Sequence, residues 1–341
     1  MVTIEDIARE AGVSATTVSN VIHGRTNRVS AYTVELINEI IRERGYVPNL
    51  SARAMKTRSS KVVALINHLE SRDQQKFMSD PFFSDLTGAV EKALRERGYF
   101  LMIRALSDPE ELTAFLRNWN VEGLFMPGLF EDEPFYETLR ALKLPVVLTD
   151  SYLSDLGSMV NIGLEDFEGA RTAVDYLAKQ GHKRIVFAGP AVKPGGVVEQ
   201  RLWGYQRALA QNGIPFDPAL VFECEFSTTK MMELGTSLAN RKDITAVFAT
   251  ADMLAAGIMS GLQQAGRMVP RDISVMGFDD INWARMTMPM LTTIHQDAEA
   301  KGRIAAQCMI SLLEGSAIPI QNRSLPVRLV IRDSVGAPPE K

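Results

Sequence analysis

Cysteine and histidine are scarce in this chain of 341 residues, which contains two cysteines and four histidines. Cys224 and Cys308 lie far apart and belong to no CxxC or Cys/His cluster. We therefore interpret both as small buried hydrophobic residues rather than as metal ligands or a disulfide. The histidines show no metal-ligand spacing, so the sequence predicts no metal site and no cofactor.

The sequence motifs of common enzymes are also absent. No GxGxxG follows an apolar strand, no GxxxxGK[ST] loop occurs, and GxSxG is missing. Neither nucleotide-dependent nor serine-dependent catalysis therefore has support in the sequence. We expect a protein that is not an enzyme.

Long apolar runs are missing as well. No stretch of 18 or more apolar residues suggests a membrane span, and the N-terminus MVTIEDIARE has no apolar core typical of a secretory signal. These features predict a cytoplasmic protein with no membrane partner.

Positive charge is not in excess overall, because the formal net charge is −4. Its distribution is uneven, however: residues 20–60 carry seven Arg or Lys against three Glu. Since local charge sets the field that a phosphate group experiences, this basic segment keeps nucleic acid among the possible partners.

The first 46 residues contain the start and stop signals of three short helices. Thr3 and Ser14 are suited to cap the first two helices, and Gly12 separates them by a tight turn. Ser30 begins a third helix, and Gly45 ends it. Two helices joined by a short glycine turn and braced by a third predict a helix-turn-helix unit.

The second of these helices, GVSATTVSNVI, carries short polar groups on one face. If its valines and Ile22 pack inward, the outward residues are Ala15, Thr16, Ser19 and Asn20. Compact side chains of this kind suit base edges in the DNA major groove, where an amide can bond adenine at two positions. Ser14 and Thr17, at the helix start, suit phosphate. The alternative is an ordinary helical hairpin whose exposed residues happen to be polar.

From residue 61 onward, apolar strands alternate with amphipathic helices. This pattern is typical of α/β folds with doubly wound parallel sheets, and its length predicts two lobes with a cleft between them. The expected strands cover residues 61–66, 100–105, 123–128, 145–150, 184–189, 220–226, 246–251 and 273–278, with returning strands in 292–296 and 325–334.

Polar side chains follow several of these strands. Asp150, Asp252 and Asp279 each come directly after an apolar run, and Arg201 lies in the helical segment RLWGY. Ligands of open α/β sheets bind beyond the carboxyl ends of the strands, and carboxylates with a guanidinium group suit a polyhydroxylated molecule. The alternative for each aspartate is that it only caps the next helix.

These stretches resemble the lac repressor family of transcriptional regulators over residues 3–315. TIEDIAREAGVSATTVSNVI is similar to the family's headpiece, and LSARAMKT to its hinge. DPFFSDLTGAVEKALRERGY, RLWGYQRAL, VPRDISVMGFDDI and PMLTTIHQ are similar to segments of its effector domain.

The resemblance implies a homodimer that binds a near-palindromic double-stranded operator and is gated by a small-molecule effector. It implies that the hinge folds on DNA and inserts a side chain into the minor groove, a position held here by Met55. The residues expected to contact DNA are Thr3, Ser14, Ala15, Thr16, Thr17, Ser19, Asn20, Asn49, Ala52, Arg53 and Met55.

The resemblance also implies the effector site. The expected residues are Asp80, Phe82, Phe83, Asp150, Arg201, Asp252 and Asp279. Two departures from the family pattern affect this expectation. Asn20 replaces the usual Arg of the recognition helix, which favours an adenine contact, and Ala251 replaces an Asn that precedes Asp252.

The sequence thus predicts a helix-turn-helix headpiece in 1–47, a hinge and linker in 48–60, and a two-lobed effector and dimerisation domain like periplasmic binding proteins in 61–341. One lobe is expected to take about 61–160 and 291–322, the other about 161–290 and 323–336. The predicted function is a repressor gated by a sugar or related metabolite. The alternative is a small-molecule binding protein or a sugar-modifying enzyme on the same fold.

Overall fold

The computed structural model describes residues 2–22, 24–46, 59–68 and 80–340. The chain divides into two compact units, Met1–Ser60 and Lys61–Lys341. Among the described residues, no helix combines the length and apolar character needed to cross a bilayer.

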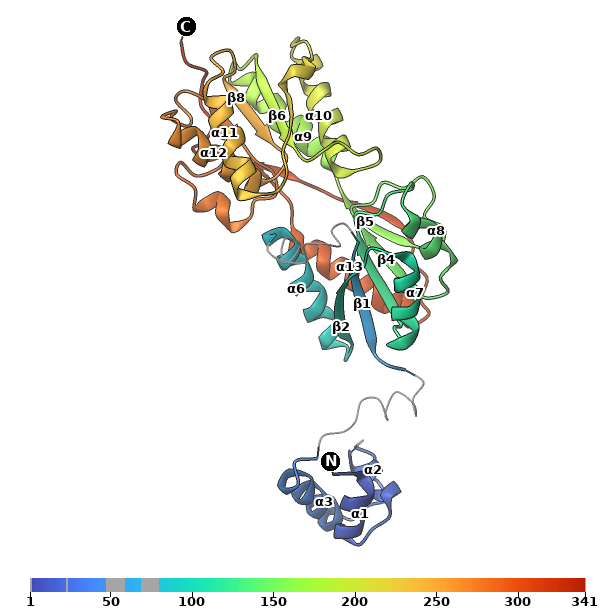
Figure 1. The fold of residues 1–341 in the computed structure, drawn as a ribbon. Helices are drawn as coiled ribbons and strands as arrows, with labels where there is room; N and C mark the ends of the chain where they lie inside the picture. Colours follow the sequence, from blue (N-terminus) through green and yellow to red (C-terminus); the bar gives the residue numbers. More distant parts are fainter. Residues whose placement is uncertain (1, 23, 47–58, 69–79, 341) are drawn as a thin grey trace. The chain divides into compact units, whose positions relative to one another are not determined.

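The described residues of the first unit form three helices, α1 (Ile4–Ala11), α2 (Ala15–Ile22) and α3 (Ala31–Glu43) (Figure 1). The predicted caps are confirmed. Thr3 forms a capping box with Asp6, and Ser30 accepts the backbone N–H of Thr33 at 3.1 Å. Gly12 ends α1 with a φ of 65°, a left-handed conformation that glycine adopts without strain. The unit packs around six buried residues, Ile7, Ala8, Val18, Val21, Ile37 and Ile40.

The second unit is built on two separate parallel sheets, as the alternating pattern predicts. The first sheet has the strand order β11-β5-β4-β3-β1-β2. Its strands are β1 (Val62–Asn67), β2 (Phe100–Ala105), β3 (Gly123–Pro127), β4 (Val146–Thr149), β5 (Val160–Leu164) and β11 (Asn322–Leu325). Its helices are α6 (Pro81–Glu96), α7 (Pro109–Asn118), α8 (Pro134–Ala141) and α13 (Ala298–Leu313).

Alternate residues of the strands face opposite sides of this first sheet. Leu65 of β1 packs in the core beneath α6 and α13, whereas its neighbours Ala64 and Ile66 pack in the core beneath α7 and α8. Both faces are therefore covered, which explains why the central strands are continuous apolar runs.

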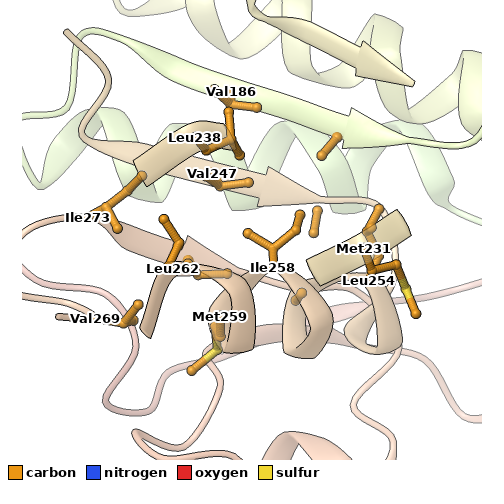
Figure 2. Packing of buried hydrophobic residues seen from close by; sticks show 14 of the residues in the cluster. Val186, Met231, Leu238, Val247, Leu254, Ile258, Met259, Leu262, Val269 and Ile273 are labelled. Carbon is orange, nitrogen blue, oxygen red and sulfur yellow. The ribbon is translucent and has the colours of Figure 1, made fainter. Parts of the chain in front are cut away.

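The second sheet has the order β7-β6-β8-β9. Its strands are β6 (Ile185–Gly189), β7 (Val221–Glu223), β8 (Ala246–Ala249) and β9 (Ser274–Met276). Its helices are α9 (Asp166–Lys179), α10 (Val197–Gln211), α11 (Thr228–Ala239) and α12 (Asp252–Gln264). Figure 2 shows one face of this lobe, where Val186 and Val247 of the sheet meet Leu254, Ile258 and Leu262 of α12.

Within the described residues the chain crosses between the two lobes three times. Each crossing falls a few residues later in the sequence than expected. Residues 161–164 belong to β5 of the first sheet, because this strand pairs in parallel with β4, where Leu148 is opposite Asn161. Residues 323–325 belong to the same sheet as part of β11. Strand β10 (Thr293–His295) instead pairs with β12 (Arg328–Val330) and bridges to Asp279, so residues 291–295 belong to the second lobe.

Candidate functional sites

Helix α2 follows α1 after a three-residue turn. The N–H of Val13 bonds to the carbonyl of Ala8, and the Ser14 hydroxyl accepts the N–H of Thr17 at 3.1 Å, which confirms the predicted cap. Val18 and Val21 are buried against the other two helices. One face of α2 is thereby fixed against the core of the unit, and the opposite face is turned away from it.

The short polar residues of α2 occupy that outer face. Thr16 is exposed, whereas Ala15, Ser19 and Asn20 are half-buried and Ser14 at the helix start is exposed. These residues form a continuous strip along a rigid helix. Such a strip of short hydrogen-bonding groups has the dimensions and chemistry to meet base edges in a major groove.

Two exposed arginines, Arg25 and Arg28, lie in the turn that follows α2. The backbone N–H of Arg25 bonds to the carbonyl of Asn20, so this turn is fixed to the end of the helix. Arg44 is instead engaged by Glu10, with N–O distances of 3.0 and 3.1 Å. The predicted contacts at Asn49, Ala52, Arg53 and Met55 lie outside the described residues.

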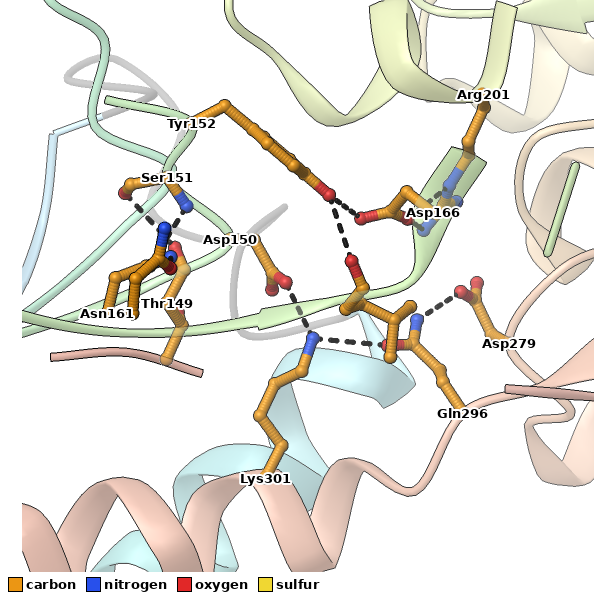
Figure 3. A network of polar contacts seen from close by, with 12 residues as sticks. Thr149, Asp150, Ser151, Tyr152, Asn161, Asp166, Arg201, Asp279, Gln296 and Lys301 are labelled. Carbon is orange, nitrogen blue, oxygen red and sulfur yellow. Dashed lines mark hydrogen bonds and ion pairs between the residues drawn. The ribbon is translucent and has the colours of Figure 1, made fainter. Parts of the chain in front are cut away.

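In the second unit, polar side chains from both lobes form two neighbouring hydrogen-bonded groups, one around Asp166 and one around Lys301, which together we call the interlobe network (Figure 3). Its members are Asp150, Tyr152, Asp166, Arg201, Asp279, Gln296 and Lys301. Three of them, Asp150, Arg201 and Asp279, were predicted from the sequence.

Asp150 lies at the carboxyl end of β4, with a φ of 54° that only a small share of non-glycine residues adopt. Its carboxylate accepts a hydrogen bond from Lys301 Nζ at 2.6 Å. Burial raises the pKa of Asp150, and the charge of Lys301 opposes this shift. The site therefore holds a buried ion pair at the end of a central strand.

Arg201 of α10 is held on the second lobe by a buried carboxylate. Its Nε and Nη2 atoms contact Oδ1 of Asp166 at 2.8 and 2.7 Å, and its guanidinium carbon lies 3.6 Å from the centre of the Phe278 ring. Burial lowers the pKa of Arg201, but Asp166 and Asp279 outweigh this effect and the net shift is upward. Arg201 therefore remains a fixed cation.

Tyr152 joins the two lobes. Its hydroxyl donates to Oδ2 of Asp166 at 2.5 Å and contacts the carbonyl of Leu164 at 3.2 Å. Tyr152 follows β4 of the first sheet, whereas Asp166 begins α9 of the second lobe. Any relative movement of the lobes at this point must lengthen or replace this bond.

Asp279 lies after β9 with a φ of 120°, and Gln296 Nε2 donates to its carboxylate at 2.6 Å. Burial raises the pKa of Asp279 to about 7, although Arg201 acts in the opposite direction. Asp80 is a further carboxylate that raises this pKa. Asp279 thus accepts a hydrogen bond from Gln296 and interacts electrostatically with the cation Arg201, an arrangement that suits a ligand with hydroxyl groups.

The structure gives Asp252 a different environment from the other predicted residues. Its Oδ2 accepts the N–H of Ile281 at 3.0 Å and its Oδ1 accepts the hydroxyl of Thr293 at 2.5 Å, and the residue is fully buried. Its carboxylate thus holds the loop that carries Asp279.

The predicted residues of α6 lie at the start of that helix. Asp80 caps it by accepting the N–H of Phe82 at 2.9 Å, and Phe82 is buried with its ring 5.1 Å from Lys301 Nζ. Phe83 is half-buried and contacts Phe82 edge to face. The Phe82 ring thus borders the ion pair of Asp150 and Lys301 on the first lobe, and Phe83 packs against Phe82.

Four network members were missed in the sequence: Tyr152, Asp166, Gln296 and Lys301. Asp166 follows β5, a strand that the sequence pattern did not reveal because Asn161 and Gly163 interrupt its apolar run. Tyr152 could have been found, since it lies two residues after Asp150. Lys301 gave no signal, because a lysine in an amphipathic helix is ordinarily placed on the solvent side.

The comparisons with known proteins match both units. The family of bacterial regulatory proteins of lacI type matches residues 3–49, and the periplasmic binding protein-like domain matches residues 174–335. The transcriptional regulator CelR of Thermobifida fusca is 32% identical over 338 residues, which cover 97% of this chain and 98% of that protein. The chain belongs to the LacI family.

Solved LacI-family structures agree with this fold. The lac repressor dimer bound to operator and an anti-inducer is 26% identical, with a TM-score of 0.83 over 98% of this chain and 99% of that chain. A CelR–cellobiose complex is 30% identical, with a TM-score of 0.73 over 98% of this chain and all of that chain.

Family membership settles the class of function. This LacI-family chain is a DNA-binding transcriptional regulator of the repressor type, with an effector domain like periplasmic binding proteins, and it is not an enzyme, because its relatives are regulators. Within the part of the chain that the structure describes, no group of three or more His, Cys, Asp or Glu side chains could hold a metal ion.

Proposed function

We propose that this chain represses transcription by binding a near-palindromic operator as a homodimer, and that a neutral polyhydroxylated effector, a sugar or a related metabolite, gates the binding. In this proposal residues 1–47 read DNA, residues 48–60 form the hinge, and residues 61–341 bind the effector and the second subunit. The observation that most supports this proposal is the strip of short polar residues on α2. The same chain also contains the interlobe network.

On DNA, Asn20 supplies an amide that bonds adenine at two positions, and Ala15 and Thr16 place methyl groups near thymine. Ser14 and Thr17 at the start of α2, together with Thr3 at the start of α1, bind phosphate and fix the register. Ser19 lies on the same face as Asn20. In the hinge, Met55 enters the minor groove, while Asn49, Ala52 and Arg53 contact the adjacent backbone.

At the proposed effector site, the hydroxyl groups of a ligand can both donate and accept hydrogen bonds, and the site offers partners for both. Asp150 and Asp279 accept hydrogen bonds, and Arg201 donates them. Asp80, Phe82 and Phe83 border this position on the first lobe, and Asp252 supports it from behind through Ile281. CelR, a relative of this chain, has been solved in complex with cellobiose, which supports a sugar as the effector class.

Effector binding is coupled to DNA through the lobes. A sugar that bonds Asp166 competes with Tyr152, and so changes the contact that joins the lobes. The effector shifts the equilibrium only by its different affinities for the two arrangements. Both induction and corepression satisfy this scheme.

DNA recognition is tested by selecting binding sites for the full chain from random duplexes and measuring their affinities by fluorescence anisotropy. Selection should return a two-fold symmetric sequence. Asn20→Ala should weaken binding by about 1–3 kcal/mol and relax the preference at one base pair of each half-site. Asn27→Ala, in an exposed turn position, is the matched control. An unchanged base preference in the Asn20 variant would remove it from base readout.

The effector class is tested by thermal shift with cellobiose, ribose and other neutral sugars. A ligand at 100 times its dissociation constant should add about 2.7 kcal/mol of stability. The sugar that does so should also change operator affinity. Stabilisation by anionic metabolites alone would contradict a neutral effector.

A further inference from the structure

Lys301 is the most deeply buried cation of the interlobe network. It lies in the first turn of α13, and 1% of its side chain is exposed. Removing an ammonium group from water is costly, and the positive end of the helix dipole opposes it further. A lysine in such a position persists only where its partners compensate for both costs.

The partners of Lys301 come from both lobes (Figure 3). Its Nζ donates to Asp150 at 2.6 Å and to Oε1 of Gln296 at 3.3 Å. Gln296 in turn donates through Nε2 to Asp279 at 2.6 Å. Gln296 lies on a segment that passes between the lobes, directly before α13, so a single ammonium group is connected to one carboxylate on each lobe.

These connections fix the orientation of the Gln296 amide. Because Lys301 is a donor, it can engage only the oxygen of that amide, which directs the NH₂ group toward Asp279. Without Lys301 only Asp279 orients the amide, so the donor to Asp279 is held at one end instead of at both. The ion pair also holds Asp150 in its unusual backbone conformation.

We propose that Lys301 is a positioning residue of the effector site, which holds Asp150 directly and Asp279 through Gln296 so that both lobes present their carboxylates together. The expected effect of Lys301 on effector binding rests on the proposed function. The positioning itself is a property of the ligand-free protein.

The decisive experiment uses hydrogen–deuterium exchange on the full chain without any sugar. The N–H of Asp279 bonds to the carbonyl of Ile294 at 2.7 Å, and the N–H of Gln296 bonds to the carbonyl of Asp279 at 3.2 Å. Lys301→Met should speed exchange at these two amides by about threefold or more, since they lose a shared anchor. Lys143→Met, at an exposed position before β4, should leave them unchanged.

A second variant keeps the test valid if Lys301→Met does not fold. Lys301→Met with Asp150→Asn removes both charges of the buried pair, so no carboxylate is left without a counter-ion. It should retain the fold and still show faster exchange at Asp279. Wild-type exchange at Asp279 and Gln296 in this double variant would overturn the proposal, because Lys301 would then support only its own lobe.

Binding provides the second readout. With the neutral sugar that stabilises the wild type in thermal shift, Lys301→Met, which leaves Asp150 and Asp279 in place, should bind about tenfold more weakly or worse. Unchanged affinity would overturn the role of Lys301 in the site. If no sugar binds the wild type, the proposed effector class fails, and the exchange measurement still decides whether Lys301 positions Asp279.

Discussion

The outer face of α2 and the interlobe network use polar side chains in opposite ways. On α2 the polar groups are short, uncharged and accessible, and they stand on a helix that is fixed by local caps and a small core. In the interlobe network most of the polar groups are charged, all are buried or half-buried, and each bonds to at least one other member. In the proposed function, α2 meets DNA with its outer face and keeps local bonds such as that of Ser14 with Thr17, whereas the interlobe network must exchange internal partners for those of a ligand.

This difference separates recognition from switching. A strip such as that of α2 changes little when it binds, because its scaffold is already rigid. A network whose members come from two lobes cannot accept a ligand without altering the contacts between the lobes, such as that of Tyr152 with Asp166. In the proposed function, buried charge therefore suits the part of the protein that responds to effector, and short polar groups on an outer face suit the part that reads DNA.

The largest effect is expected where a buried charge loses its partner. Arg201→Ala leaves the carboxylate of Asp166, which is 1% exposed, without its counter-ion, and should destabilise the effector domain by about 3–5 kcal/mol. Urea unfolding followed by tryptophan fluorescence measures this, because all three tryptophans lie after residue 60. Arg171→Ala, which breaks a more exposed pair with Glu168 on α9, should cost less than about 1 kcal/mol. Equal losses of stability in the Arg201→Ala and Arg171→Ala variants would refute the expected difference between the buried and the exposed ion pair.

The next effect depends on pH and concerns Asp279. Its pKa in the folded protein is about 7, compared with an ordinary value of 3.8, so the folded state retains a proton that the unfolded state has lost. This penalty on folding is absent below pH 4, grows as the pH rises toward 7, and is constant above it. Asp279→Asn removes it. Relative to wild type, the variant should therefore gain about 2–4 kcal/mol between pH 4 and pH 8.

The control for this pH series is Asp272→Asn. Arg271 and the N–H of Met268 lower the pKa of Asp272, so its contribution to stability is present at neutral pH and is lost as the pH falls. The two variants should thus differ in the sign of their pH dependence. A flat difference between Asp279→Asn and wild type would show that the buried carboxylate is fully compensated.

The same contrast explains what the sequence could predict. The caps at Thr3, Ser14 and Ser30 are local, since each acts within three residues, and all three were readable from the chain. Asp150 and Asp279 were readable because each follows an apolar strand. The caps and the places of these two aspartates after their strands depend on short-range rules and are confirmed, whereas the role of Asp150 and Asp279 in effector binding stays a prediction.

Positions that depend on distant partners were not readable. Strand β11, with the polar sequence NRSL, is a strand only because it pairs with β5. Lys301 is buried only because Asp150, 151 positions earlier, compensates its charge. Asp252 appeared to be a ligand-facing residue from its place after a strand, and only the structure reveals that Ile281 and Thr293 occupy its carboxylate.

The smallest effect is expected in the first unit, where the interactions are local and exposed. Thr3→Ala removes the hydroxyl that accepts the N–H of Asp6 at 3.2 Å, and should destabilise the three-helix unit by about 1 kcal/mol. Helix content followed by circular dichroism should show this loss, while the tryptophan signal of the effector domain stays unchanged. Thr16→Ala, the same change at an exposed position inside α2, should alter stability by less than about 0.5 kcal/mol. A shift in the tryptophan transition with Thr3→Ala would mean that the two units unfold together, and local capping would then no longer account for the stability of the DNA-reading unit.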